Sequence, residues 1–378
     1  MEREDPLGRT NRLRLLVAGG GTGGHVIPAL VLAREFLRRD PLRPNSSREV
    51  LFVGTRRGIE TRLVPPAGFP LELLEVGMLQ GQSLRVRMST LIDLPRSCWQ
   101  AMKILDRFRP HVVLGVGGYA SGPVMLAAAF RGIPLAVFEP NAYPGLVNRW
   151  IAPYVARAFV AFEGAVRFFG SGKTVVSGIP VREEFFSVPP ARRRPPFTVL
   201  LFGGSQGARS INRAVVEALP KLDQLKAQVA LLHQTGENEY NRVQEEVAKH
   251  SVSVQVFAFL DRMWDAFSRA DLVVCRSGAS TVAELAAAGR AAILVPYPAA
   301  ANEHQLRNAE ALQRIGAARL ILDRNLDGET LSGAIVELLE RPDELQRMES
   351  AMRRMAHPQA ATRIVDELER LGKRVSGE

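Results

Sequence analysis

The 378-residue sequence has only two cysteines, Cys98 and Cys275, and they lie in unrelated contexts without metal-ligand spacing. This argues against a disulfide framework and against a zinc site. Long apolar runs are also missing, because none reaches the roughly 18 residues that a membrane span needs. The first residues, MEREDPLGRTN, are acidic and polar rather than basic and then apolar. We therefore expect no signal peptide and a cytoplasmic chain.

The sequence is strongly basic, with 49 lysine and arginine residues against 39 aspartate and glutamate residues and a formal net charge of +10. This balance favours a negatively charged partner, which could be nucleic acid, an anionic membrane surface or a phosphorylated substrate. The arginines are scattered, and the densest cluster, Arg192 to Arg194, lies between prolines without interleaved aromatic residues. That distribution argues against nucleic acid and leaves the other two partners open.

The pattern of apolar segments predicts two domains, as does the length of the chain. In the first half, short apolar runs that alternate with helical patterns predict parallel strands at 13–18, 50–53, 71–76, 112–116, 135–138, 158–160 and 174–176. After the segment SVPPARRRPPF the pattern starts again, and it predicts strands at 197–202, 228–232, 252–256, 272–275, 292–295 and 318–320. We therefore expect an α/β protein with two Rossmann-like domains, residues 1–186 and 197–357, joined by a linker at 187–196. A terminal helix within 358–378 is expected to pack back on the first domain.

The first expected strand runs into a glycine-rich loop, LVAGGGTGGH, from Leu16 to His25. Glycines at this density let the backbone turn sharply beside a ligand, and the N-terminus of the following helix favours an anion by about 0.3–1 kcal/mol. The G-x-G-x-x-G spacing also occurs in dinucleotide-binding proteins, which need an acidic residue at the end of the second strand. That strand ends in Gly54-Thr55-Arg56, which disfavours a dinucleotide-dependent oxidoreductase. The structural alternative is that the glycines form a tight turn and bind no ligand. At the start of the helix, His25 carries a neutral imidazole that can act as a base.

A second candidate ligand loop follows the strand that ends at Cys275, in the segment CRSGASTVAELAAAG. The expected helix starts with small residues that suit a diphosphate: Ser277, Gly278, Ser280 and Thr281. Glu284 lies further into this helix, where it either complements the helix dipole or accepts hydrogen bonds from two ribose hydroxyls. The polar residues 302–305 follow the next strand, and loops at the carboxyl ends of parallel strands line the ligand crevice.

Seven stretches, in order along the chain, resemble the MurG-type GT-B glycosyltransferases, which convert lipid I to lipid II in peptidoglycan synthesis. The stretches are GGGTGGH (19–25), GGYASGP (117–123), PGLVNRW (144–150), GIPVR (178–182), GGSQGAR (203–209), CRSGASTVAELAAAG (275–289) and EHQLRNA (303–309). Any one of them is a weak signal, but seven in register are specific and span nearly the whole chain. The resemblance implies the GT-B fold, in which two Rossmann-like domains face each other across a cleft. It puts the acceptor site in the N-terminal half and the donor site in the C-terminal half.

The resemblance also implies which residues bind the donor, UDP-GlcNAc. They are Thr22, Gly23, Gly24, Asn141, Arg182, Ser205, Gln206, Leu260, Ala279, Ser280, Thr281, Val282, Ala283, Glu284 and Gln305. In this set Glu284 would hold the ribose hydroxyls, Gln305 the sugar, and Leu260 would pack near the uracil. No cofactor is implied beyond the donor, and no Asp-x-Asp triad occurs in a suitable loop. We therefore expect no obligatory metal ion, with the helix that begins near Gly278 stabilising the leaving group.

One loop departs from the family, which commonly has His-Glu-Gln-Asn where this chain has Phe138-Glu139-Pro140-Asn141. The implied reaction is an inverting transfer of GlcNAc to the 4-hydroxyl of MurNAc in undecaprenyl-pyrophosphoryl-MurNAc-pentapeptide, and a base must remove the hydroxyl proton. The candidates are His25, which we favour, and Glu139. Pro140 forces Glu139 toward an extended backbone, so its aim differs from that in the family pattern.

Because this acceptor is anchored in a membrane, we expect a peripheral protein at the cytoplasmic face of the cell membrane. The segment 78–94 mixes apolar residues with arginines, and its candidate membrane-facing residues are Met78, Leu79, Leu84, Arg85 and Arg87. A buried helix is the alternative for the residues after Met88. Two other functions stay open. One is another GT-B transferase or a UDP-GlcNAc 2-epimerase, and the more distant one is the oxidoreductase.

Overall fold

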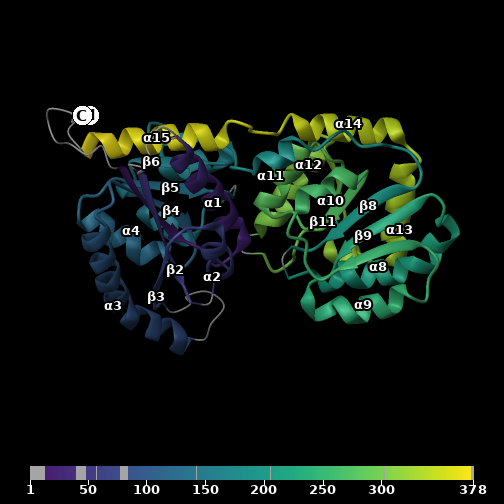
Figure 1. The fold of residues 1–378 in the computed structure, drawn as a ribbon, viewed down its shortest axis with the longest axis horizontal. Coiled ribbons are helices and arrows are strands. Elements are labelled where there is room, and N and C mark those ends of the chain that lie inside the picture. Colours follow the sequence, from purple (N-terminus) through teal and green to yellow (C-terminus); the bar gives the residue numbers. More distant parts are fainter. Residues whose placement is uncertain are drawn as a thin grey trace, which may run out of the picture. The chain divides into compact units, whose positions relative to one another are not determined.

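The structure is a computed structural model that describes residues 13–39, 48–56, 58–76, 84–141, 143–204, 206–300 and 303–375, with backbone only at 84–94 and 374–375. The chain forms two compact units (Figure 1). The N-terminal unit comprises residues 1–180 together with 359–378, and the C-terminal unit comprises residues 181–358. The proline- and arginine-rich segment 187–196 belongs to the C-terminal unit, where the backbone N–H of Arg193 donates to the carboxylate of Asp271.

The N-terminal unit is built on one parallel sheet with the strand order β3-β2-β1-β4-β5-β6-β7. The strands are β1 (Leu13–Gly19), β2 (Arg48–Thr55), β3 (Leu71–Leu74), β4 (Val112–Gly117), β5 (Leu135–Glu139), β6 (Arg157–Val160) and β7 (Thr174–Val176). Nearly every residue of β1 and β4 is buried, as expected for apolar strands covered on both faces.

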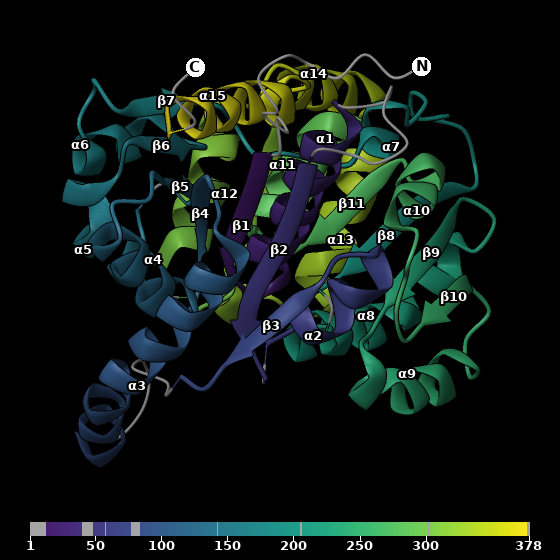
Figure 2. The same ribbon diagram turned by 60° about the vertical axis from the view of Figure 1, so that its left-hand side comes forward.

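Helices cover both faces of this sheet (Figure 2). On one face lie α1 (Gly23–Arg38) and the terminal helix α15 (Ala360–Val375), which pack against each other. On the other face lie α3 (Leu84–Phe108), α4 (Ser121–Phe130) and α5 (Leu146–Ile151). The short helices of the unit are α2 (Glu60–Leu63) and α6 (Val166–Phe169). Ion pairs fix α15, with Arg39 contacting Asp366 at 2.5 Å and Arg48 contacting Glu369 at 2.7 Å.

The C-terminal unit repeats the design with a second parallel sheet, in the order β10-β9-β8-β11-β12-β13. Its strands are β8 (Phe197–Phe202), β9 (Val229–Gln234), β10 (Ser253–Phe257), β11 (Leu272–Cys275), β12 (Ala292–Leu294) and β13 (Ala318–Leu320). Its helices are α7 (Glu183–Phe186), α8 (Arg209–Leu222), α9 (Tyr240–Val247), α10 (Met263–Arg269), α11 (Ala279–Ala288), α12 (His304–Arg314), α13 (Gly328–Leu339) and α14 (Pro342–Arg353). One buried apolar core, with α8 and α13, covers one face, and a second, with α10, α11 and α12, covers the other.

The expected fold class, two Rossmann-like parallel-sheet domains, is confirmed, and each predicted strand overlaps a strand of the structure. In both sheets the strand order reverses at the first strand, between β1 and β4 and between β8 and β11. In open α/β sheets, ligands bind outside the carboxyl ends of the strands at this switch point. None of the helices that the structure describes combines the length and apolar character of a membrane span.

Candidate active site

In the N-terminal unit, the loops that follow β1 and β4 meet backbone to backbone at the switch point. The N–H of Gly20 donates to the carbonyl of Gly117 at 3.0 Å. A Cβ on Gly19 would overlap that carbonyl oxygen, and one on Gly118 would overlap the carbonyl of Gly20. Glycine is therefore needed in the two loops because their backbones approach each other too closely for a side chain.

His25 lies in the first turn of α1, directly above this junction. Its Nδ1 is 3.1 Å from the carbonyl oxygen of Gly20 and 3.3 Å from the hydroxyl of Thr22. With the proton on Nδ1, the ring donates to this carbonyl oxygen, which only accepts, and Nε2 is then the basic nitrogen. A Cβ added to Gly117 would lie 3.0 Å from Nε2, so the ring packs over a glycine. The contact with the Gly20 carbonyl favours the tautomer that a general base needs.

Glu60 contacts the same loop, although it lies in α2 and not directly after the second strand. Its Oε2 accepts from the N–H of Gly21 at 2.7 Å, and its Oε1 accepts from the N–H and hydroxyl of Thr55 at 2.7 and 3.1 Å. The second strand itself ends without an acid, as the sequence shows, and α2 returns Glu60 to the loop from five residues further on. Both carboxylate oxygens are engaged by the protein, however, so they do not offer a ribose the acceptor pair of a dinucleotide site.

Glu139, the second candidate base, ends β5 and is only 2% exposed. One carboxylate oxygen accepts from the backbone N–H and the side-chain amide of Asn141, at 2.9 and 3.1 Å. The other accepts from the N–H of Gly145 at 3.0 Å and from the amide of Asn148 at 2.9 Å. Four donors match the lone pairs that a carboxylate offers, so Glu139 shapes the loop that carries Asn141. This geometry favours His25 as the base.

In the C-terminal unit, the second glycine loop follows β8 and packs against the loop after β9. A Cβ on Gly207 would overlap the carbonyl oxygen of Thr235, and one on Gly236 would overlap the carbonyl of Gln206. Gln234 also donates from its amide to the carbonyl of Gly204 at 2.9 Å. The side chain of Gln206 is exposed, while Ser205 lies outside the described residues.

Helix α11 follows β11, the strand next to β8, and has Gly278 as its N-cap in an extended conformation. The hydroxyl of Ser277 donates to the backbone carbonyl of Gln305 at 2.8 Å, and Asn308 donates to the carbonyl of Ser277 at 3.0 Å. The side-chain oxygen of Gln305 accepts from the N–H of Tyr297 at 3.0 Å. These bonds tie the start of α12 to the start of α11. The first turn of α11 carries the predicted residues Ala279, Ser280, Thr281 and Val282, and Ala283 follows.

Glu284 lies in the second turn of α11, and its side chain is 12% exposed. Burial raises the pKa of its carboxyl group to about 7, although Arg182, with Nη2 3.4 Å from Oε1, lowers it. The guanidinium of Arg182 also lies over the rings of Trp264 and Phe185, 4.7 and 5.2 Å from their centroids. The structure thus brings the predicted residues Arg182 and Glu284 together. Helix-dipole stabilisation explains Glu284 poorly, since the effect is confined to the first turn.

Arg276 is not among the predicted site residues, but it connects several loops at the carboxyl edge of this sheet. Its Nη1 donates to the carbonyls of Val295 and Pro296 at 3.1 Å each and to Asp323 at 2.5 Å. Its Nη2 donates to the hydroxyl of Ser210 at 2.9 Å. The arginine therefore holds the segment after β12 against the start of α8.

The remaining predicted residues lie elsewhere or are not described. Leu260 follows β10 and is half-buried against the core of the C-terminal unit. Leu84, Arg85 and Arg87 belong to the first turn of α3 by their backbone, and Met78 and Leu79 lie outside the described residues.

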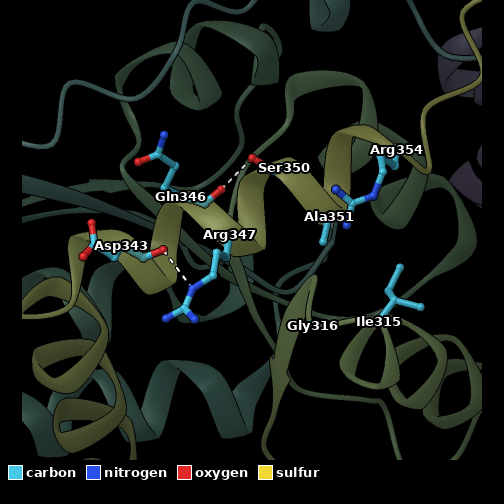
Figure 3. A pocket seen from close by; sticks show the side chains of 8 residues that line it. All are labelled: Ile315, Gly316, Asp343, Gln346, Arg347, Ser350, Ala351 and Arg354. Carbon is cyan, nitrogen blue, oxygen red and sulfur yellow. Dashed lines mark hydrogen bonds between the residues drawn. The ribbon is translucent and has the colours of Figure 1, made fainter.

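Figure 3 shows a surface hollow between α14 and the turn at Ile315 and Gly316. The two hydrogen bonds drawn in it, Arg347 to the carbonyl of Asp343 and Ser350 to that of Gln346, stay within α14. None of the predicted site residues lines it. Among the described residues, no three histidine, cysteine, aspartate or glutamate side chains are grouped so that they could hold a metal ion.

Two family models match the chain, one in each half of the sequence. Residues 15–160 match the glycosyltransferase family 28 N-terminal domain, and residues 198–364 match the family 28 C-terminal domain. A relative from Anaeromyxobacter sp. (strain K) is 45% identical over 94% of this chain and 92% of its own length. One from Geotalea daltonii is 42% identical over 94% and 97%. Both are named UDP-N-acetylglucosamine–N-acetylmuramyl-(pentapeptide) pyrophosphoryl-undecaprenol N-acetylglucosamine transferase.

Solved structures agree with these matches. The crystal structure of Acinetobacter baumannii MurG superposes with a TM-score of 0.74 at 29% identity, covering 95% of this chain and 99% of that one. A UDP-GlcNAc 2-epimerase from Neisseria meningitidis superposes with a TM-score of 0.65 at 15% identity, covering 94% and 99%, which shows a shared fold alone. On the two domain matches and on relatives matched over nearly their full length, the chain belongs to the MurG-type members of glycosyltransferase family 28.

Proposed function

We propose that this protein transfers GlcNAc from UDP-GlcNAc to the 4-hydroxyl of MurNAc in a polyprenyl-pyrophosphoryl-MurNAc-pentapeptide, with inversion at the anomeric carbon. The proposal rests on the residues that lie at the switch points of the two sheets, in a chain that belongs to family 28. One presents a histidine with Nδ1 beside a backbone carbonyl oxygen, and the other presents a helix N-terminus followed by a buried carboxylate.

In this reaction, Nε2 of His25 takes the proton of the acceptor hydroxyl as its oxygen attacks the anomeric carbon. The bond between that carbon and the phosphate oxygen breaks, and UDP leaves with the electron pair. The N-terminus of α11 stabilises the charge that develops on the diphosphate, together with the guanidinium of Arg182. The proposal contains no obligatory metal ion.

The donor nucleotide is assigned to the carboxyl edge of the C-terminal sheet. Glu284 accepts the two ribose hydroxyls, Gln305 contacts the sugar, and Leu260 packs near the uracil. The assignment is supported by the bonds of Ser277 and Asn308, which fix the starts of α11 and α12 relative to each other. In the N-terminal unit, two of the four hydrogen bonds that Glu139 accepts come from Asn141 and hold it at the end of β5.

We also propose that the N-terminal unit binds an anionic membrane surface, at the cytoplasmic face where the lipid-linked acceptor is used. Aromatic side chains are exposed along the helices of one sheet face: Trp99 on α3 (53%), Phe130 at the end of α4 (82%) and Trp150 on α5 (68%). Lys103 lies over the ring of Trp99, and Arg131 follows Phe130. Aromatic rings beside cations suit a lipid headgroup interface.

The test is incubation of the protein with UDP-GlcNAc and a lipid I analogue, followed by detection of UDP and of the disaccharide product. Formation of both is expected. Appearance of UDP-ManNAc without any acceptor would instead identify a 2-epimerase, and transfer to diacylglycerol but not to lipid I would identify a different transferase. Either result overturns the proposal.

A further inference from the structure

Glu60 is a buried carboxylate for which the proposed reaction has no direct use. It begins α2, five residues after β2 ends, and is 1% exposed. Its two oxygens connect two segments that lie 34 residues or more apart in sequence, the first glycine loop at Gly21 and the end of β2 at Thr55. Hydrogen bonds from N–H groups to a carboxylate are charge-assisted and roughly twice as strong as neutral ones.

Three glycines make room for this carboxylate. A Cβ on Gly20, Gly54 or Gly58 would in each case overlap the carboxyl group or its neighbouring methylene carbon. The glycines of the first loop therefore serve an internal side chain as well as the approach of the loop after β4. In a dinucleotide site the N–H of Gly21 would donate to a phosphate, but here it donates to Glu60.

The bond to Gly21 leads directly to the proposed base. Gly20 precedes Gly21, its N–H is fixed by the carbonyl of Gly117, and its carbonyl accepts from Nδ1 of His25. The orientation of the Gly20 carbonyl depends on the peptide unit that it shares with the N–H of Gly21, because a peptide group is planar. Glu60 and His25 thus bind the two ends of one peptide unit: Glu60 binds its N–H and His25 its carbonyl.

We propose that Glu60 is a positioning residue for His25. By holding the N–H of the Gly20–Gly21 peptide, it aims the carbonyl that fixes the proton on Nδ1 and leaves Nε2 as the base. This inference rests on the proposed function for its catalytic consequence, but not for the structural link between the two side chains.

The test is Glu60→Gln, which keeps the shape of the side chain but replaces one acceptor oxygen with an amide donor. The matched control is Glu35→Gln, which alters another buried carboxylate, on the far end of α1, that pairs with Arg38 and Arg39. The first readout is the NMR signal of the His25 ring across a pH titration, assigned by comparison with His25→Ala. We expect Glu60→Gln to shift the signal and its titration midpoint, and Glu35→Gln to leave both unchanged.

The second readout is kinetic. We expect Glu60→Gln to lower kcat by about tenfold or more and to move the acid limb of its pH profile, since a misplacement of about 1 Å costs up to roughly 100-fold. The KM for UDP-GlcNAc should stay within about twofold, because Glu284 and Gln305, which are assigned to the ribose and the sugar, lie in the other unit. A folded Glu60→Gln protein with the wild-type His25 titration and pH profile would overturn the proposal, even if its thermal midpoint were lower.

If Glu60→Gln does not fold, Thr55→Val provides a milder change, because it removes only the hydroxyl that donates to Glu60 at 3.1 Å. A smaller shift of the His25 signal is then expected, and no shift would count against the proposal. If the wild-type protein transfers no GlcNAc, the proposed function fails. The NMR comparison would still decide whether Glu60 positions His25.

Discussion

In the C-terminal unit, Nη2 of Arg182 lies 3.4 Å from Oε1 of Glu284, at the point where the donor diphosphate and ribose are assigned. The distance is long for a charge-assisted hydrogen bond, which is usually 2.7–2.9 Å. The same guanidinium also makes cation–π contacts with the rings of Trp264 and Phe185. Burial is therefore a larger influence than Arg182 on the carboxyl group of Glu284, and the pKa of this group is raised to about 7.

This pKa predicts that donor binding weakens as the pH falls below neutrality. The ionised carboxylate accepts from both ribose hydroxyls, and its protonated form does so poorly. The KM for UDP-GlcNAc should rise roughly tenfold between pH 8 and pH 6, as expected for one group that titrates near 7. Glu284→Gln should show a high KM without this pH dependence, whereas Glu337→Gln, which alters an ion pair with Arg319, should behave as wild type. A wild-type KM that does not change over this range would contradict the assignment.

Replacement of His25 by alanine should lower kcat by about 10²- to 10⁴-fold, the usual contribution of a general base. The KM for UDP-GlcNAc should change little, because the assigned nucleotide contacts of Glu284 and Gln305 do not involve the imidazole. His111→Ala is the control, since His111 accepts from the N–H of Arg14 at the opposite, amino end of the sheet. Steady-state rates with a lipid I analogue provide the measurement, and a loss below about tenfold would reject His25 as the base.

The sequence was sufficient to predict both sheets because a parallel strand buried on both faces is a short, nearly continuous apolar run. The strand of β11, for example, is Leu272–Cys275 in the prediction and in the structure. The resemblance supplied residues such as Arg182 and Glu284, which the structure brings together.

Contacts between distant segments could not be predicted in this way. Glu60 reaches a loop 39 residues earlier, and Arg276 reaches Asp323, 47 residues later. No local sequence pattern identifies the partners of Glu60 and Arg276. A charged residue that is buried by tertiary contacts cannot be distinguished in the sequence from a charged surface residue. The same holds for Glu139, whose spacing from Asn148 did not reveal that its carboxylate is fully engaged.

Acid should destabilise the C-terminal unit through Asp223. Hydrogen bonds from His250, and then from the backbone of Val252 and Ser251, lower the pKa of this carboxyl group to about 2. Because the folded pKa lies below the ordinary value near 3.8, this stabilisation is present above pH 4 and is lost as the pH falls toward 2. Asp223→Asn should lower the thermal midpoint at pH 7. On acidification, the thermal midpoint of this variant should fall by less than that of the wild type. Asp265→Asn, which alters an exposed pair with Arg262, is the control, and equal acid sensitivity of all three proteins would contradict the prediction.

Binding to anionic vesicles should depend on the exposed aromatic residues of the N-terminal unit. Replacing Phe130 and Trp150 together by serine should strongly reduce co-sedimentation with phosphatidylglycerol vesicles, since each ring buries a large apolar area in the headgroup region. Ile315→Ser, which changes an exposed apolar residue of the C-terminal unit, should bind as wild type. A parallel variant with polar residues at Met78, Leu79 and Leu84 tests the segment predicted from sequence. If the variant at Met78, Leu79 and Leu84 loses vesicle binding and the variant at Phe130 and Trp150 does not, then Phe130 and Trp150 are not the membrane-binding residues.

Alanine substitutions at Gly204 and Gly207 should separate backbone strain from steric overlap in the second glycine loop. Both residues have positive φ, +100° and +75°, so alanine is strained at either position by about 1 kcal/mol or more. A Cβ on Gly204 has no neighbour within 4 Å, whereas one on Gly207 would overlap the backbone carbonyl of Thr235. Gly207→Ala must therefore push the loop away from the one after β9, and it should lower the thermal midpoint further and raise the KM for UDP-GlcNAc much more than Gly204→Ala. Differential scanning fluorimetry and donor kinetics on the two variants measure these effects. Equal losses would mean that strain alone, and not the contact between the two loops, shapes the donor site.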